Sequence, residues 1–198
     1  MDEQYLYAKL SQGSYGNQPV EGYDIDPQFS NQNRTLYVSK TDPTKAVYSF
    51  RGTDLATRSN KWKDIGTDAL LALGLKDVSS RFQNALEATK QAQSKYKDLT
   101  LTGTSLGGSQ GLYVAQKTGL PARIFNPGIS PLDVKRTKGA IMADSIANLL
   151  RPKAKSNVVA YTTVVDPISS LTPFVAGVKT VAVKPKMRNT HSLKNFLP

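Results

Sequence analysis

The chain has 198 residues, of which 39% are apolar and 21% charged, and a formal net charge of +11 at pH 7; these values fit a single domain, residues 1–198, with a substantial core. It contains no cysteine and one histidine, which excludes disulfides, thiolate catalysis and zinc motifs built on cysteines or paired histidines. No apolar run approaches the roughly 18 residues of a membrane span, and the acidic start lacks the plan of a signal peptide. We therefore expect a soluble, metal-free protein, either cytoplasmic or peripheral to membranes.

Stretches typical of strands and of amphipathic helices alternate along most of the chain. Helical character is predicted for Asp2–Ser11, for the segment from Trp62 to Leu73, and for Ser80–Tyr96, Gln110–Lys117 and Asp144–Leu150. Strands are predicted for Tyr23–Phe29, Thr35–Ser39, Lys45–Arg51, Leu99–Thr102, Ala122–Phe125, Val158–Thr163 and Thr180–Val183. Strands separated by helices indicate an α/β protein with a mostly parallel central sheet and helices on both faces. The first strands, joined by short turns, are expected to form an antiparallel edge.

The most informative motif is Gly-x-Ser-x-Gly, with Ser105 between Gly103 and Gly107. It lies between an apolar strand and a helical segment, which is where a nucleophilic serine sits on a strained strand-to-helix turn. Small neighbours two residues away on either side let such a turn close, and the free N–H groups of the helix favour developing negative charge. The alternative is that Ser105 is an ordinary capping residue at the start of a glycine-rich helix.

A nucleophilic serine needs a base, and the base needs an orienting carboxylate. The single imidazole belongs to His191, and in serine hydrolases with this type of sheet the chain order is serine, acid, histidine. Three acids lie between Ser105 and His191, namely Asp133, Asp144 and Asp166. Asp166 is the preferred one because it follows a predicted strand, at the sheet edge where active-site loops gather. Asp133 has the surroundings of a helix cap and Asp144 those of a solvated helix charge.

The same chemistry needs two hydrogen-bond donors for the oxyanion. One is expected to be the N–H of Leu106, the residue after the nucleophile. The other is expected at the end of the Lys45–Arg51 strand, where Gly52 permits close approach and Thr53 offers both an N–H and a hydroxyl. The alternative there is a plain glycine turn capped by Asp54.

The positive charge of the chain is unevenly distributed. Residues 1–30 carry a net charge of −4, whereas the chain from Lys135 onward carries +9. This asymmetry suggests an anionic partner such as a membrane surface or nucleic acid, or else a solvated basic face. No recognisable nucleic-acid-binding module accompanies it, so no specific nucleic-acid partner is expected. The pattern says nothing of an oligomeric state.

Six segments of the chain, taken together, resemble the class 3 lipases, which are α/β-hydrolases similar to the fungal triacylglycerol lipases. The resemblance rests, in chain order, on segments 8–15, 48–53, 62–65, 101–108, 166–168 and 191–196. It implies Ser105 as nucleophile, Asp166 and His191 as its partners, and Thr53 with Leu106 as the oxyanion hole. Thr104 stands where the family commonly has histidine.

The sequence therefore predicts a serine esterase or lipase that cleaves carboxylic esters of lipids through an acyl-enzyme, without a cofactor. The expected partners are a lipid or ester substrate and an anionic membrane surface. Two alternatives stay open: a catalytically inert basic protein that binds nucleic acid or anionic membrane, and an acyltransferase. The segment Arg58–Leu75 is expected to be either a lid or a buried helix packed on the sheet.

Overall fold

The computed structural model describes residues 2–52, 75–128, 157–164, 177–187 and 192–198. Its helices are α1 (Glu3–Gly13), α3 (Leu75–Lys95), α4 (Leu106–Thr118) and the short 3-10 helix η3 (Leu193–Phe196). Its strands are β1 (Tyr23–Ile25), β2 (Arg34–Ser39), β3 (Lys45–Phe50), β4 (Asp98–Ser105), β5 (Ala122–Pro127), β6 (Val158–Thr163) and β7 (Val178–Val183). Among these residues no helix is long and apolar enough to cross a membrane.

The described strands form one seven-stranded sheet whose spatial order follows the chain, from β1 to β7. The first three strands pair antiparallel, and β3 to β7 pair parallel. The predicted mostly parallel sheet with an antiparallel edge is therefore confirmed. Because β3 to β7 run in the same direction, their carboxyl ends meet at one edge of the sheet, where ligands of α/β proteins bind.

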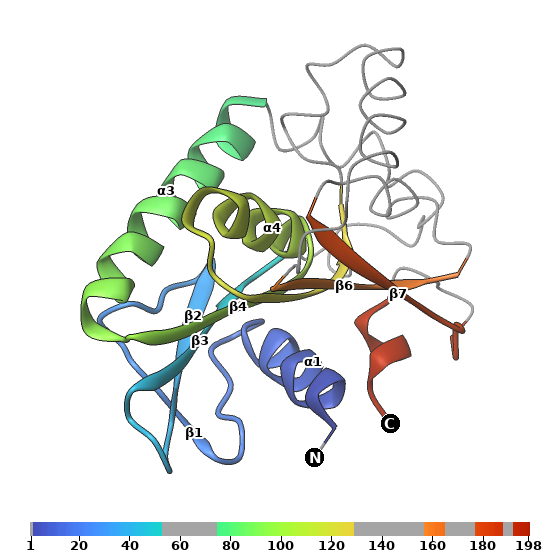
Figure 1. The fold of residues 1–198 in the computed structure, drawn as a ribbon, viewed down its shortest axis with the longest axis horizontal. Helices are drawn as coiled ribbons and strands as arrows, with labels where there is room; N and C mark the ends of the chain where they lie inside the picture. Colours follow the sequence, from blue (N-terminus) through green and yellow to red (C-terminus); the bar gives the residue numbers. More distant parts are fainter. Residues whose placement is uncertain (1, 53–74, 129–156, 165–176, 188–191) are drawn as a thin grey trace.

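Helices cover both faces of this sheet, as predicted (Figure 1). On one face, Tyr48, Phe50 and Ile124 belong to a buried cluster that also contains side chains of α3 and α4. On the other face, Phe125 packs with Ala8 of α1 and Phe196 of η3. Neighbours along one strand, such as Ile124 and Phe125, thus fill opposite layers, because strand side chains alternate between the faces.

Element boundaries differ from the predicted ones mainly around the Gly-x-Ser-x-Gly motif. Strand β4 runs on to Ser105 instead of ending at Thr102, and α4 begins at Leu106 rather than Gln110. Glycine has a low propensity for both strand and helix. A prediction from residue composition therefore ends the strand too early and begins the helix too late. At the other end of the sheet, β1 stops at Ile25, before Phe29, because the Asp26 carboxylate accepts the Gln28 N–H in a turn.

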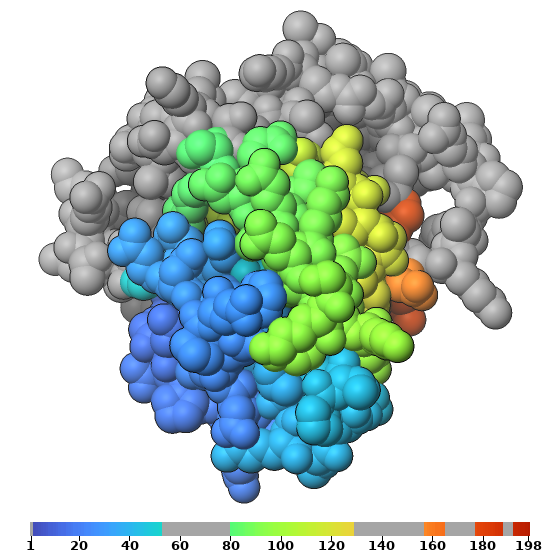
Figure 2. All heavy atoms as spheres, turned by 90° about the vertical axis from the view of Figure 1, so that its left-hand side faces the viewer, coloured from blue at the N-terminus to red at the C-terminus, as the bar shows by residue number. Residues whose placement is uncertain are grey.

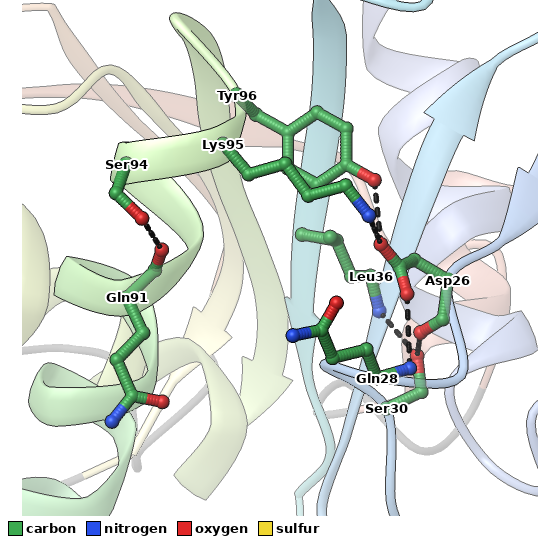
Figure 3. Close-up of polar contacts among 8 residues, drawn as sticks. All are labelled: Asp26, Gln28, Ser30, Leu36, Gln91, Ser94, Lys95 and Tyr96. Atoms are coloured by element: carbon green, nitrogen blue, oxygen red, sulfur yellow. Dashed lines mark hydrogen bonds and ion pairs between the residues drawn. The ribbon is translucent and has the colours of Figure 1, made fainter.

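A buried carboxylate joins this turn to the end of α3 (Figure 3). Asp26 is 8% exposed, and its Oδ2 accepts hydrogen bonds from Lys95 Nζ at 2.7 Å and Tyr96 Oη at 2.6 Å. Burial by itself would raise the pKa of Asp26, but the bonds from Lys95, Tyr96 and the Gln28 N–H outweigh it and hold that pKa below its ordinary value. Both carboxylate oxygens of Asp26 accept hydrogen bonds, and the cluster connects the edge of the sheet to the end of α3.

Candidate active site

Ser105 lies at the junction of β4 and α4, at the carboxyl edge of the parallel strands, and is half-buried. Its backbone has φ +55° and ψ −128°, a positive φ that side-chain-bearing residues rarely adopt. Its side chain makes no capping hydrogen bond to α4. The reading of Ser105 as an ordinary N-cap is therefore wrong, because a capping residue has extended backbone and bonds the first helical N–H groups.

Glycines allow the turn to form by bringing three backbone segments into contact. A Cβ at Gly103 would lie 2.6 Å from the Gly107 carbonyl carbon and 2.9 Å from the Phe50 oxygen. A Cβ at Gly107 would lie 2.7 Å from the Phe50 carbonyl carbon. All three distances are shorter than a side chain tolerates, so α4 can start directly against the end of β3 only with glycine at these positions.

Two residues that the sequence analysis did not single out brace the turn from the β5 side. The Gly128 N–H donates to the Ser105 carbonyl at 3.1 Å, and the Ser109 hydroxyl lies 3.3 Å from the same carbonyl and 2.9 Å from that of Gly128. The β4–β5 register also shifts between Thr104 and Ser105. These bonds hold the strained peptide in place, which is how a sparsely populated backbone conformation persists in a folded protein.

The loop after β3 lies directly beside Ser105. A Cβ at Gly52 would lie 3.4 Å from the Ser105 Cβ and 2.7 Å from the Thr104 carbonyl oxygen. The preceding residue, Arg51, is fixed through its N–H to the Asn33 carbonyl and through its own carbonyl, which accepts from Arg81 Nη2 at 3.0 Å. The close approach predicted for Gly52 is thus present. Thr53 itself lies outside the described residues.

Leu106 is the first residue of α4 and is buried. The first N–H groups of a helix have no intrahelical acceptor, and the positive end of the helix dipole is located there. The backbone N–H of Leu106 is therefore at a place where negative charge is stabilised.

The other predicted site residues, Asp166 and His191, lie outside the described residues, as do Asp133 and Asp144. The strands that precede the first two are described: β6 ends at Thr163, and β7 ends at Val183. Their ends are joined by the bond from the Val164 N–H to the Val183 carbonyl at 2.9 Å.

A buried asparagine links the end of β6 to the end of β5. Asn126 Oδ1 accepts the Thr163 N–H at 2.9 Å, and Asn126 itself has a positive φ of 38°. The sequence analysis did not single out Asn126. A polar residue directly after an apolar strand and before Pro127-Gly128 was the available signal for this role, since asparagine tolerates positive φ and bonds nearby backbone.

The fold and this turn define an α/β protein with the strained strand–serine–helix junction typical of serine hydrolases. A family model described as phospholipase-like, the Tle-like phospholipase domain, matches residues 8–193. The chain belongs to this family, and lipid-ester hydrolysis is the activity that the match supports. No curated protein matches the chain.

The family match agrees with the lipase-like resemblance at its coarser level, that of a lipase or phospholipase. It names the Tle-like phospholipases and does not extend to the class 3 lipases. The matched range includes Thr53, Ser105, Leu106, Asp166 and His191, so all five predicted site residues lie within the family domain.

Proposed function

We propose that this protein hydrolyses carboxylic ester bonds of lipids through an acyl-enzyme on Ser105. The observation that carries the proposal is the positive φ of Ser105 combined with a side chain that does not cap the helix it precedes. Strain of this kind costs about 1–3 kcal/mol and persists where function requires it. A hydroxyl that makes no bond to its own helix is available for chemistry.

In the proposed mechanism, His191 removes the proton of the Ser105 hydroxyl as the oxygen attacks the ester carbonyl. Asp166 holds the imidazole in the required tautomer and stabilises the imidazolium. The tetrahedral intermediate collapses when His191 protonates the leaving alcohol. Water then attacks the acyl-enzyme by the same route and releases the fatty acid, and no cofactor takes part.

The oxyanion is proposed to bind between two chain segments that meet at Ser105. The Leu106 N–H at the start of α4 supplies one donor, and Thr53 supplies the second through its N–H or hydroxyl. The role of Thr53 is supported by the close approach of Gly52 to Ser105, since Thr53 directly follows Gly52 in the chain. Parallel pairing of β3 with β4 brings both strand ends to the same edge.

The triad proposal has support from topology as well. Asp166 follows the end of β6 by three residues, and His191 follows the end of β7 by eight. Both strands run parallel to β4, so these connections leave from the edge that carries Ser105. The order of the three residues along the chain is also the serine, acid, histidine order of hydrolases with this type of sheet.

Recruitment to anionic membranes is a further part of this proposal. Lys179 and Lys184 are exposed on and just after β7, and Met187 nearby is 46% exposed. Each such charge near an anionic surface contributes about 1 kcal/mol to binding.

The double variant Lys179→Glu and Lys184→Glu should weaken vesicle binding and leave hydrolysis of a soluble short-chain ester unchanged. An equal effect on vesicle binding and on ester hydrolysis would refute recruitment.

A lipid panel with product analysis by mass spectrometry tests the proposed reaction. Vesicles of phosphatidylcholine, of phosphatidylglycerol and emulsions of triacylglycerol are incubated with the wild type and with Ser105→Ala. Free fatty acid formed by the wild type alone supports hydrolysis. Acyl groups recovered on an added alcohol instead of water would indicate a transferase, and head-group release without fatty acid would contradict the proposal.

A further inference from the structure

A cavity of about 240 Å³ lies between the chain leading into β2, helix α3 and the first turns of α4. Figure 2 shows the face of the molecule on which the segment around β2, in blue, meets α3, in green. The residues that line the cavity include Asn31, Arg34, Arg81, Asn84, Glu87 and Gln110. The volume is below the roughly 300–1,000 Å³ of sites for drug-sized ligands, so a small polar group fits the cavity better than an acyl chain.

Three of the lining side chains have a buried N–H group without an acceptor among the described residues. These groups are Nε of Arg34, Nε of Arg81 and Nε2 of Gln110. Gln110 is 2% exposed, so bulk water does not satisfy its amide. A buried donor without an acceptor costs about 1–3 kcal/mol. All three groups are donors, and no side-chain acceptor atom of the lining residues is buried without a hydrogen-bond partner. The cavity is therefore complementary to a ligand rich in acceptor atoms.

The charges of the lining point to a negative ligand. Arg34 and Arg81 contribute two guanidinium groups, and Glu87, which is exposed, contributes one carboxylate. In the part of the chain that the structure describes, no ion pair joins Glu87 to either arginine. Burial, together with the nearby charge of Arg51, lowers the pKa of Arg81, so the surroundings disfavour the positive charge of its guanidinium group. An anion between the guanidinium groups would supply the missing compensation.

We propose that this cavity binds an anionic phosphate group, either inorganic phosphate or a phosphate monoester. Guanidinium groups match the geometry of phosphate oxygens, and the Gln110 amide adds a neutral donor from α4. The proposal does not depend on the chemistry of Ser105. It does have a structural connection to it, because Arg81 also donates to the Arg51 carbonyl, one residue before Gly52.

Isothermal titration with inorganic phosphate at constant ionic strength tests the proposal directly. The wild type should bind one phosphate per chain, and Gln110→Leu and Arg34→Gln should each weaken binding about tenfold or more. Lys90→Gln is the matched control, since Lys90 is exposed on α3 outside the cavity lining. It should bind within about twofold of the wild type. Absence of saturable binding, or an equal loss in Lys90→Gln, would overturn the proposal.

A second variant tests the preference for negative charge without a phosphate ligand. Gln110→Glu keeps the size of the side chain and places a carboxylate in the cavity that Arg34 and Arg81 line. If the cavity is built for an anion, this variant should melt at a higher temperature than the wild type and lose phosphate binding. A lower melting temperature would contradict the proposal, because a buried charge without compensation destabilises the fold.

Vesicle sedimentation separates the two sources of the phosphate group. Vesicles of phosphatidylcholine with and without phosphatidic acid, a lipid phosphate monoester, are compared for the wild type and Gln110→Leu. If the ligand is a lipid head group, phosphatidic acid increases binding of the wild type, while Gln110→Leu and added phosphate both reduce it. If the ligand is free phosphate, titration still detects the site and Gln110→Leu does not alter vesicle binding. A site absent from both measurements would overturn the proposal.

Discussion

The turn at Ser105 and the hydrogen-bonded cluster around Asp26 both lie at ends of strands of the same sheet, and their structures are opposite in kind. At Asp26 a carboxylate is buried and bonded to Lys95, Tyr96 and a backbone N–H, with ordinary backbone around it. At Ser105 the backbone has a positive φ, and the side chain makes no bond to the helix it begins. The first arrangement stabilises the fold, whereas the second stores strain and leaves a hydroxyl without a bond to its own helix.

This difference gives opposite expectations for substitution at the two places. Replacing the Ser105 side chain should abolish activity with little loss of stability, or with a gain. Changes at Asp26 should lower stability and leave activity intact, because β1 is the outer strand of the sheet and lies three strands from β4.

The largest expected effect is on catalysis. Ser105→Ala and His191→Ala should each lower kcat for a soluble ester by about 10⁴-fold or more, because in the proposed mechanism each removes a group that acts in the transition state. Their melting temperatures should stay close to that of the wild type. Since His191 is the single histidine of the chain, retained activity in purified His191→Ala would refute the triad.

The next effect tests the glycine contacts that form the turn. Gly107→Ala should lower the free energy of unfolding by about 2–3 kcal/mol, because the new Cβ meets the backbone of Phe50, which cannot move aside. Gly111→Ala is the matched control in the same helix. Its Cβ would meet the far end of the Ile124 side chain, and it should unfold within about 1 kcal/mol of the wild type in urea. Equal stabilities would show that the contact is not a constraint.

The strain itself can be measured by comparing two substitutions at Ser105. Ser105→Gly should be more stable than Ser105→Ala by about 1–2 kcal/mol, because glycine adopts positive φ freely and alanine does not. Both variants should be inactive. Denaturant unfolding measures the difference, and a Ser105→Gly protein less stable than Ser105→Ala would mean that the turn is not strained.

The smallest effect is expected at the Asp26 cluster. Asp26→Asn should cost about 1 kcal/mol near neutral pH, because it weakens the bonds from Lys95 and Tyr96 while keeping the side-chain size. The pKa of Asp26 is lowered by folding, so this stability is present above the ordinary value of 3.8 and is lost as pH falls through the lower folded value. Unfolding curves of both proteins should therefore converge in acid. A constant difference across pH would argue against ionisation as the cause.

Strand pairing and the two helix layers could be predicted from the sequence, because strands such as Lys45–Phe50 carry dense apolar patterns bounded by turn residues. The Ser105 turn could be predicted because its glycines and serine have a fixed spacing. The roles of Ser109, Gly128 and Arg81 could not. Each depends on a contact between segments far apart in the chain, and nothing in the local pattern specifies such a partner.

The central claim, that Ser105 is an activated nucleophile, is tested most directly with a fluorophosphonate probe and intact-mass detection. The wild type should gain a single adduct, mapped by peptide analysis to Ser105, and Ser105→Ala should gain none. His191→Ala should react far more slowly, because the hydroxyl then lacks its base. A wild-type protein that stays unmodified under conditions that label a known serine hydrolase, or that is labelled equally in Ser105→Ala, would contradict the account.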